Sequence, residues 1–357
     1  NVLPRHLNKH IDYGVVPSAA GVKDASLATP TGMVVTGDGT KLYVAAFGSS
    51  AIGVFDTGQL ENDTFTPSAA SHIAVSGGGP TGLVLDAPRS RIYAFTRFDN
   101  SISTIDTGTN QEVAHQSVYS PEPASIVNGR PFLYDAFFTS SNGEASCSSC
   151  HIFGDFDSLA WDLGNPDDSV LNNPNPMRLI LPGQDPDFHP LKGPMTTQSL
   201  RGMANAGPMH WRGDRTGGTT GGDPLDEQLA FKAFNPAFVS LLGRASQLPA
   251  ADMQAFTDFV LTIAYPPNPI RSLDGVLTAQ EAAGQNFFLN TITDGRVCNG
   301  CHSLPLGTAG LSSFEGETQE FKVPHLRNLY QKVGMFGVPG GIPGIPGTAN
   351  LGPQVRG

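Results

Sequence analysis

The phrase Pro30-Thr31-Gly32-Met33-Val34-Val35 returns 50 residues later as Pro80-Thr81-Gly82-Leu83-Val84-Leu85. The match continues without a gap into Leu42-Tyr43-Val44 and Ile92-Tyr93-Ala94, and then into a shared Asp-Thr-Gly. Each copy contains alternating apolar and polar residues, separated by turn-forming residues, which predicts short β-strands. A repeat of this length with three or four strands is typical of a β-propeller blade.

The repeated phrase resembles the YVTN family of bacterial surface and periplasmic β-propellers. The resemblance implies propeller-type blades of antiparallel strands over residues 1–135, with a third, degenerate copy from Pro123 to Tyr134. Propellers usually close with four to eight blades. We therefore expect the chain to be a piece of a longer protein, with the remaining blades supplied by a longer or a second chain.

All four cysteines lie in two copies of the pattern C-x-x-C-H, at 147–151 and 298–302. In this pattern two thiols bind one haem covalently, and the histidine coordinates the iron as proximal ligand. A redox dithiol or half of a zinc site is the alternative. Both are disfavoured, because each pair is followed directly by histidine and no cysteine is left over. The residues predicted to hold two haem c groups are Cys147, Cys150, His151, Cys298, Cys301 and His302.

The second motif lies in a setting typical of a cytochrome c domain. Thr278 and Glu281 form a predicted capping box that opens a helix ahead of Cys298. The sequence thus predicts two mainly α cytochrome c-like domains after the blades, over residues 136–270 and 271–357.

Three further segments resemble the di-haem bacterial cytochrome c peroxidases and their MauG relatives: residues 189–194, 209–215 and 321–328. The third, Phe-Lys-Val-Pro-His-Leu-Arg-Asn, is the most specific. The resemblance implies that His189 is the distal ligand of the first haem and that Trp211 is the aromatic bridge between the two haems.

Other ligands and catalytic residues remain open at this stage. His210 is an alternative to His189 as distal ligand of the first haem, and Met335 is the candidate sixth ligand of the second. Peroxidatic family members carry an acidic residue after an Asn-Pro pair for proton transfer. Here Phe238 occupies that position, and Glu227 is the nearest acid on the same predicted helix. A peroxidase would therefore use His189, Trp211 and Glu227.

Composition limits the partners and the compartment. The net charge of −11 argues against nucleic acid and suits a cationic redox partner, such as a small cytochrome or a cupredoxin, or a neighbouring multi-haem protein. No apolar run is long enough to span a membrane. Haem attachment to C-x-x-C-H predicts a periplasmic, extracellular or cell-surface location in a bacterium. Acidic residues between Asp155 and Asp168 could also bind Ca²⁺.

Two functions follow. The first is electron transfer by a di-haem c-type cytochrome with a propeller-type docking or assembly module. The alternative is a peroxidase- or MauG-like oxidoreductase that acts on peroxide or a partner protein at the first haem. The missing acid at Phe238 favours electron transfer.

Overall fold

The chain divides into two compact units, which are described separately below. Unit 1 contains residues 1–150 and 235–259, and unit 2 contains residues 151–234 and 260–357. The computed structural model describes residues 2–173, 187–268, 271–293, 295–310, 312–313 and 321–327.

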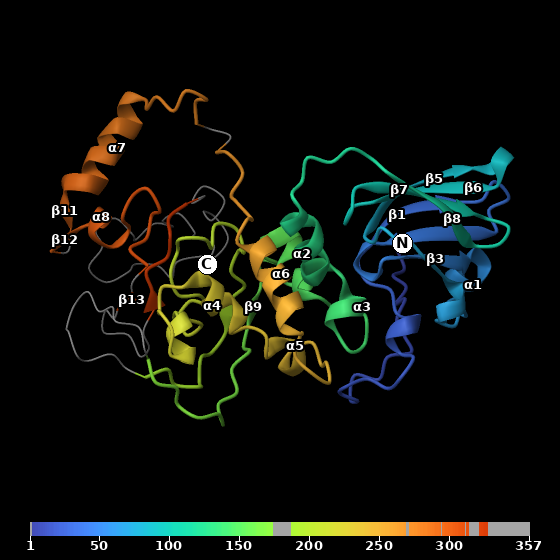
Figure 1. Ribbon diagram of the computed structural model, residues 1–357, viewed down its shortest axis with the longest axis horizontal. Helices are drawn as coiled ribbons and strands as arrows, with labels where there is room; N and C mark the ends of the chain where they lie inside the picture. The colour runs from blue at the N-terminus through green and yellow to red at the C-terminus, as the bar shows by residue number, and fades with distance from the viewer. Residues whose placement is uncertain are drawn as a thin grey trace. The chain divides into compact units, whose positions relative to one another are not determined.

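The N-terminal part of unit 1 contains two antiparallel four-stranded sheets (Figure 1). Blade 1 consists of β1 (Pro30–Val35), β2 (Lys41–Ala46), β3 (Ala51–Asp56) and β4 (His72–Ala74). Blade 2 consists of β5 (Pro80–Asp86), β6 (Arg91–Thr96), β7 (Ser101–Asp106) and β8 (Gln111–Ser117). In both sheets the strands pair in sequence order. Both sheets therefore resemble propeller blades, as the repeat predicts.

The two blades pack face to face through apolar side chains. Because side chains alternate along a strand, Tyr43 and Ile52 point to one face of blade 1, and Ile92 and Ala94 point to one face of blade 2. These two faces meet in a single hydrophobic core, whose buried residues are Tyr43, Ile52, Ile73, Val75, Ile92, Ala94 and Ile105.

The first strands of the two blades approach closely at the repeated Pro-Thr-Gly phrase. A Cβ atom on Gly32 would lie 2.5 Å from the backbone oxygen of Thr81. The Thr31 hydroxyl lies 3.1 Å from the same oxygen and donates a hydrogen bond to it. Glycine is thus needed at position 32 because no side chain fits between the strands.

The opposite face of blade 1 is covered by the chain's own N-terminal segment. Leu7 and Leu27 pack there on Val44 and Phe55. The side-chain amide of Asn8 exchanges two hydrogen bonds with the backbone of Leu27, at 2.9 and 2.8 Å.

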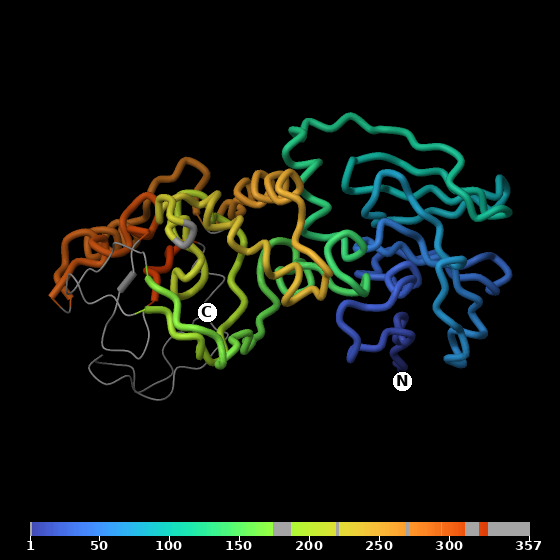
Figure 2. Tube along the Cα trace, turned by 60° about the horizontal axis from the view of Figure 1, so that its bottom comes forward, coloured from blue at the N-terminus to red at the C-terminus, as the bar shows by residue number. Residues whose placement is uncertain are grey.

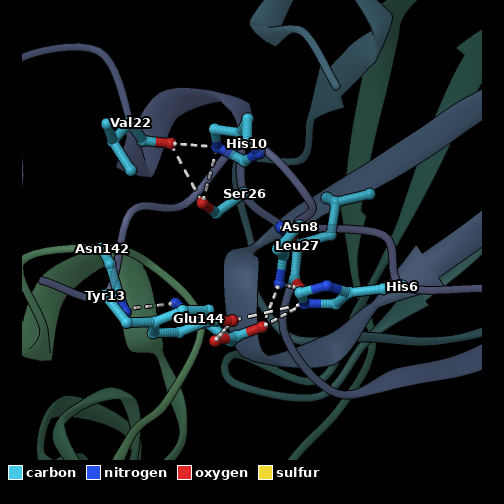
Figure 3. Close-up of polar contacts among 9 residues, drawn as sticks. All are labelled: His6, Asn8, His10, Tyr13, Val22, Ser26, Leu27, Asn142 and Glu144. Carbon is cyan, nitrogen blue, oxygen red and sulfur yellow. Dashed lines mark hydrogen bonds and ion pairs between the residues drawn. The ribbon is translucent and has the colours of Figure 1, made fainter. Parts of the chain in front are cut away.

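Glu144 holds the same segment in place (Figure 3). Its carboxylate accepts hydrogen bonds from Asn8 at 3.1 Å and from the Tyr13 hydroxyl at 2.7 Å, and it lies 3.1 Å from the His6 ring. Blade 1 therefore has the centre of both faces covered within unit 1, and only its β1 edge, at Met33 and Val35, is exposed.

The predicted third blade copy is wrong, because its residues form the helix α2 (Ala124–Tyr134). Its buried residues Gly129, Arg130 and Leu133 recur at helical rather than alternating spacing. The helix α6 (Ala250–Val260) runs beside it, with the Phe132 and Phe256 rings 6.3 Å apart (Figure 2). Tertiary packing against a distant segment thus decides the helical state of these residues.

Short helices complete unit 1. The α-helices are α1 (Thr57–Glu61), α3 (Ala136–Thr139) and α5 (Ala237–Ser240). The 3-10 helices are η1 (Lys23–Ala25), η2 (Phe47–Ser49), η3 (Ala69–Ser71), η4 (Ala87–Arg89) and η5 (Cys147–Ser149).

Unit 2 has little regular structure among its described residues. The helices are η6 (Ile152–Gly154), η7 (Gly217–Thr220), α4 (Glu227–Lys232), α7 (Ala279–Asn290) and α8 (Cys298–Cys301). The two-residue strands are β9 (Ala160–Trp161), β10 (Met195–Thr196), β11 (Ile292–Thr293), β12 (Arg296–Val297), β13 (Ser312–Ser313) and β14 (Phe321–Lys322). The predicted capping box of Thr278 and Glu281 is confirmed at the start of α7. The residues after the blades thus form a helical region with long connecting loops.

The two equivalent glycines offer a matched test of blade packing. We expect Gly32→Ala to lower the free energy of unfolding by about 1–3 kcal/mol, because its methyl group would collide with the next blade. Gly82→Ala should change it by less than about 0.5 kcal/mol, because no described atom lies within 4 Å of a Cβ there. Urea denaturation of both variants measures the difference, and equal losses would contradict the close approach.

Candidate haem-binding sites

The first motif begins on a tight turn at the end of unit 1. Cys147 starts η5, and Cys150 follows directly after it in a helical backbone conformation. Residues three apart in such a turn project to the same side. The boundary between the two units then falls between Cys150 and His151. The two thiols thus share one side of a short helical turn, as attachment to a single group requires.

A backbone carbonyl orients the ring of His151. Its Nδ1 lies 2.9 Å from the carbonyl oxygen of Gln198. A carbonyl oxygen can only accept, so Nδ1 carries the hydrogen and Nε2 keeps its lone pair. Burial lowers the pKa of His151, and the nearby ring of His210 lowers it further. His151 is therefore a neutral imidazole with Nε2 available, which is the state that binds a metal.

The second motif shows the same arrangement. Cys298 and Cys301 begin and end α8, and His302 follows at the end of the helix. Its Nδ1 lies 2.9 Å from the carbonyl oxygen of Pro324 and 3.3 Å from that of Gly307. Both partners are acceptors, so Nδ1 again donates and Nε2 keeps its lone pair. Pro324 belongs to the segment at 321–328 singled out in the sequence.

The four cysteines are free thiols. None of them, all of which lie in the described residues, is joined in a disulfide. Burial raises the pKa of the Cys147 thiol to about 12, which disfavours the reactive thiolate of a redox motif at the first pair. Within the described part of the chain, no three Cys, His, Asp or Glu side chains gather as metal ligands.

His210 lies in unit 2 and is held by a buried carboxylate. Its Nδ1 is 2.9 Å from Asp214, and its ring meets the Phe234 ring edge to face. Burial lowers the pKa of His210 despite that carboxylate. A carboxylate on one ring nitrogen is the usual support of a metal-binding histidine. His210 is also close enough to His151 to lower the pKa of His151.

Asp214 is the centre of a charged cluster. Its side chain lies 2.9 Å from the Lys192 amine and 3.4 Å from the Arg212 guanidinium, in addition to His210. Burial would favour the protonated carboxyl, but His210 and Lys192 hold the pKa of Asp214 well below its usual range. The carboxylate is therefore charged and fixes the orientation of His210.

The other distal candidate, His189, is exposed. Its Nδ1 accepts a hydrogen bond from the backbone N–H of Leu191 at 3.1 Å, and its carbonyl accepts one from Arg212 at 2.6 Å. Nδ1 of His189, the nitrogen that a carboxylate would otherwise hold, is thus occupied by a hydrogen bond within the histidine's own loop. Met335, the candidate ligand of the second haem, lies outside the described residues.

The candidate catalytic residues His189, Trp211 and Glu227 all lie in unit 2, whereas Phe238 lies in unit 1. The Trp211 indole donates to the carbonyl of Thr196 at 2.8 Å in unit 2, and Glu227 accepts from the backbone N–H of Gly207 at 3.0 Å in the same unit. Phe238 is buried in unit 1 and packs on Phe256. At the Asn-Pro-x-Glu position the chain thus has a core residue that cannot transfer a proton.

The acidic stretch considered for Ca²⁺ makes protein contacts instead. Asp155 pairs with Arg201 at 2.8 Å, and Asp157 accepts from the Trp161 indole at 2.8 Å. These carboxylates stabilise the loop on which they lie.

Sequence reasoning missed the groups that orient the histidines. The carbonyls of Gln198 and Pro324 have no side-chain signature, because any residue carries a carbonyl. Asp214 lies within the segment 209–215, where the family resemblance implies no role for it. Its spacing of four residues from His210 was the available signal.

Comparisons with known proteins give only distant likenesses. No known family and no curated protein matches the chain. Among solved structures, it is similar to hydrazine synthase of Kuenenia stuttgartiensis, at 24% identity over 25% of each chain with a TM-score of 0.21. The same enzyme pressurized with 20 bar xenon gives 22% identity over 54% of this chain and 55% of that chain, with a TM-score of 0.36.

A third solved structure is the periplasmic gluconolactonase of Pseudomonas aeruginosa, at 15% identity over 26% of this chain and 27% of that chain, with a TM-score of 0.23. The chain thus spans between about a quarter and about half of the length of these structures. A search of the described helices for a membrane span found none of sufficient length and apolar character.

The buried carboxylate of Asp214 generates a stability prediction. Asp214→Asn removes the charge that faces Lys192, Arg212 and His210, so we expect unfolding to become easier by about 3–5 kcal/mol. Asp162→Asn, at an exposed loop position, should have no measurable effect. Guanidinium denaturation of the two purified variants compares their stabilities, and an Asp214→Asn variant of unchanged stability would show that the cluster does not stabilise unit 2.

Proposed function

We propose that this protein is a di-haem c-type cytochrome that transfers electrons outside the cytoplasmic membrane, with its blades as a docking or assembly module. One observation carries the proposal. Both motif histidines bind a backbone carbonyl through Nδ1 at 2.9 Å, which leaves Nε2 available beside a pair of thiols. Two separate segments with this arrangement fit two haem groups better than they fit any other cofactor.

The residues present fit haem c at each motif. Cys147 and Cys150 would bind one group and Cys298 and Cys301 the other, with His151 and His302 as proximal ligands. Haem c supplies a one-electron redox centre when it is bound. The chain's own contribution is to fix the tautomer and the orientation of each imidazole through the Gln198 and Pro324 carbonyls. The prediction of two covalent haem c groups rests on these contacts.

We further propose His210, rather than His189, as the second ligand at the first haem. His210 has its Nδ1 fixed by the buried Asp214, whereas Nδ1 of the exposed His189 is engaged by its own loop. Two histidine ligands would leave no open position at the iron, which favours electron transfer over peroxide chemistry. Trp211, whose indole is fixed by Thr196, remains the candidate bridge between the haems.

The alternative function is a peroxidase- or MauG-like oxidoreductase at the first haem. Unit 2 does contain an acid–base pair that could serve it. Burial lowers the pKa of Lys322 to about 8, and the Glu227 carboxylate acts against this shift. The backbone N–H of Lys322 donates to the Trp211 carbonyl at 2.8 Å, so this pair lies next to the proposed bridge. Glu227 would be the proton donor that Phe238 cannot be.

The net charge of −11 supports a cationic redox partner, either a small cytochrome or a cupredoxin, or a neighbouring multi-haem protein. Covalent haem attachment supports a periplasmic or cell-surface location.

Haem stoichiometry tests the proposal first. The chain, exported in a bacterium with c-type haem maturation, should carry two haems per polypeptide that survive denaturation. Replacing Cys147 and Cys150 by serine should remove one haem, and the same change at Cys298 and Cys301 the other. Ser148→Ala is the matched control within the motif. A purified chain without covalent haem would refute the proposal.

Spectroscopy then separates the two functions. We expect both haems to be low-spin and six-coordinate in the oxidised and reduced protein. His210→Ala should convert the first haem to high spin, whereas His189→Ala should leave the spectrum unchanged. Electron paramagnetic resonance and optical spectra measure this. A native reduced haem that binds cyanide or consumes peroxide would favour the oxidoreductase, and a spin change with His189→Ala alone would reverse the ligand assignment.

A further inference from the structure

The 50-residue repeat gives each residue of blade 1 an equivalent in blade 2, and the two do not share the same environment. Tyr43 and Ile52 of blade 1 are 1% and 0% exposed, because they pack against blade 2. Their equivalents Tyr93 and Ile102 are each 37% exposed. The same face of the same kind of sheet is therefore covered in blade 1 and open in blade 2.

The cross-strand pairing confirms that these residues form one continuous face. Tyr93 pairs with Val84 on β5, and Ile102 pairs with Phe95 on β6. All four side chains are at least one third exposed. We call Gly82, Val84, Tyr93, Phe95 and Ile102 the tyrosine face of blade 2.

The glycines of the repeated phrase show the same contrast. Gly32 lies against the first strand of the next blade, where a Cβ would be 2.5 Å from the Thr81 oxygen. At Gly82 no described atom lies within 4 Å of a Cβ. The Tyr43 hydroxyl also donates to Asn110 of blade 2 at 3.3 Å. The tyrosine face of blade 2 thus carries the features with which blade 1 contacts its neighbour.

The interface between the blades indicates which surface would fit. The tyrosine-bearing face of blade 1 packs on an aliphatic face of blade 2, which is formed by Leu83, Leu85, Ile92, Ala94 and Ile105. A surface that fits the tyrosine face of blade 2 is therefore another sheet with aliphatic side chains at alternate positions.

A second copy of this chain has no such face available among its described residues. The aliphatic face of blade 2 is covered by blade 1. That of blade 1 is covered by Leu7 and Leu27 over Val44 and Phe55, and only its β1 edge, at Met33 and Val35, is exposed. The N-terminal segment that carries Leu7 is fixed by Asn8 and Glu144 (Figure 3). Self-association would have to join two tyrosine faces, which the blade interface does not do.

We propose that the tyrosine face of blade 2 docks the aliphatic face of a further propeller-type blade carried by a partner chain. The contact continues the packing already present between blades 1 and 2, one repeat further along. It rests on the docking or assembly role that the proposed function gives to the blades, and it does not depend on haem binding.

Site-specific photocrosslinking tests this proposal in the cells that naturally produce the protein. The full-length chain carries p-benzoylphenylalanine in place of Tyr93, and a control chain carries it in place of Val35, which is exposed on the other face of blade 1. Mass spectrometry identifies the crosslinked peptide. We expect Tyr93 to crosslink to a different polypeptide, at a strand with apolar residues at alternate positions, and Val35 not to do so.

A second substitution tests whether the crosslink depends on the tyrosine face of blade 2. Adding Ile102→Asp should reduce the yield roughly tenfold or more, because it introduces a charge into the centre of the contact. Adding Val35→Asp should leave the yield unchanged, and circular dichroism checks that both variants fold.

The remaining outcomes would overturn the proposal. These are no crosslink at Tyr93, a crosslink to a second copy of this chain or to another part of the same polypeptide, and a crosslink unaffected by Ile102→Asp. Sedimentation of the purified chain provides an independent check. We expect a monomer at micromolar concentration, and a dimer lost with Ile102→Asp would assign the face to self-association.

Discussion

A β-sheet has two faces, and each apolar face must be covered by something for the sheet to be stable in water. Most of unit 1 follows from this constraint. Blade 1 has one face on blade 2 and the other beneath the N-terminal segment, which Asn8 and Glu144 hold in place. Blade 2 has only one face covered, by blade 1. At Gly32 the covered face of blade 1 leaves no room for a Cβ beside the Thr81 oxygen. At Gly82, on the uncovered face of blade 2, no described atom lies within 4 Å of a Cβ.

A second constraint governs the two C-x-x-C-H motifs. A histidine binds a metal through a ring nitrogen that carries no hydrogen, and the group that holds its other nitrogen fixes the tautomer and the orientation of the ring. Here backbone carbonyls of Gln198 and Pro324 do this for His151 and His302, and Asp214 does it for His210. The Gln198 and Pro324 carbonyls are 47 and 22 residues from the histidines that they hold, so unit 2 can be loop-rich and still orient these rings.

Several features of the chain could be decided only from the tertiary structure. Residues 124–134 partly match the repeated blade phrase, yet they form α2. The reason is that Gly129 and Leu133 are buried together on one face of that helix. His189 looked at least as good a distal candidate as His210, since both are single histidines in segments that resemble one family. The buried carboxylate of Asp214 distinguishes the two histidines, because it holds His210 and not His189. Whether the helical region forms two cytochrome c domains remains a proposal tied to the haem measurements.

The sequence by itself determined the two blade-like sheets, because a repeat with alternating apolar residues can bury them only as strands. It also determined the pairing of each two thiols with a following histidine, since that chemistry is local to five residues. The capping box at Thr278 was equally local and is confirmed. Only the tertiary structure decided which carbonyl orients each imidazole, which distal histidine is supported, and which of two equivalent blade faces remains open. The carbonyl contacts and the open blade face depend on segments distant in the chain, which no local pattern of residues specifies. The contact between His210 and Asp214 is local in sequence, but the burial of that carboxylate is decided by the fold.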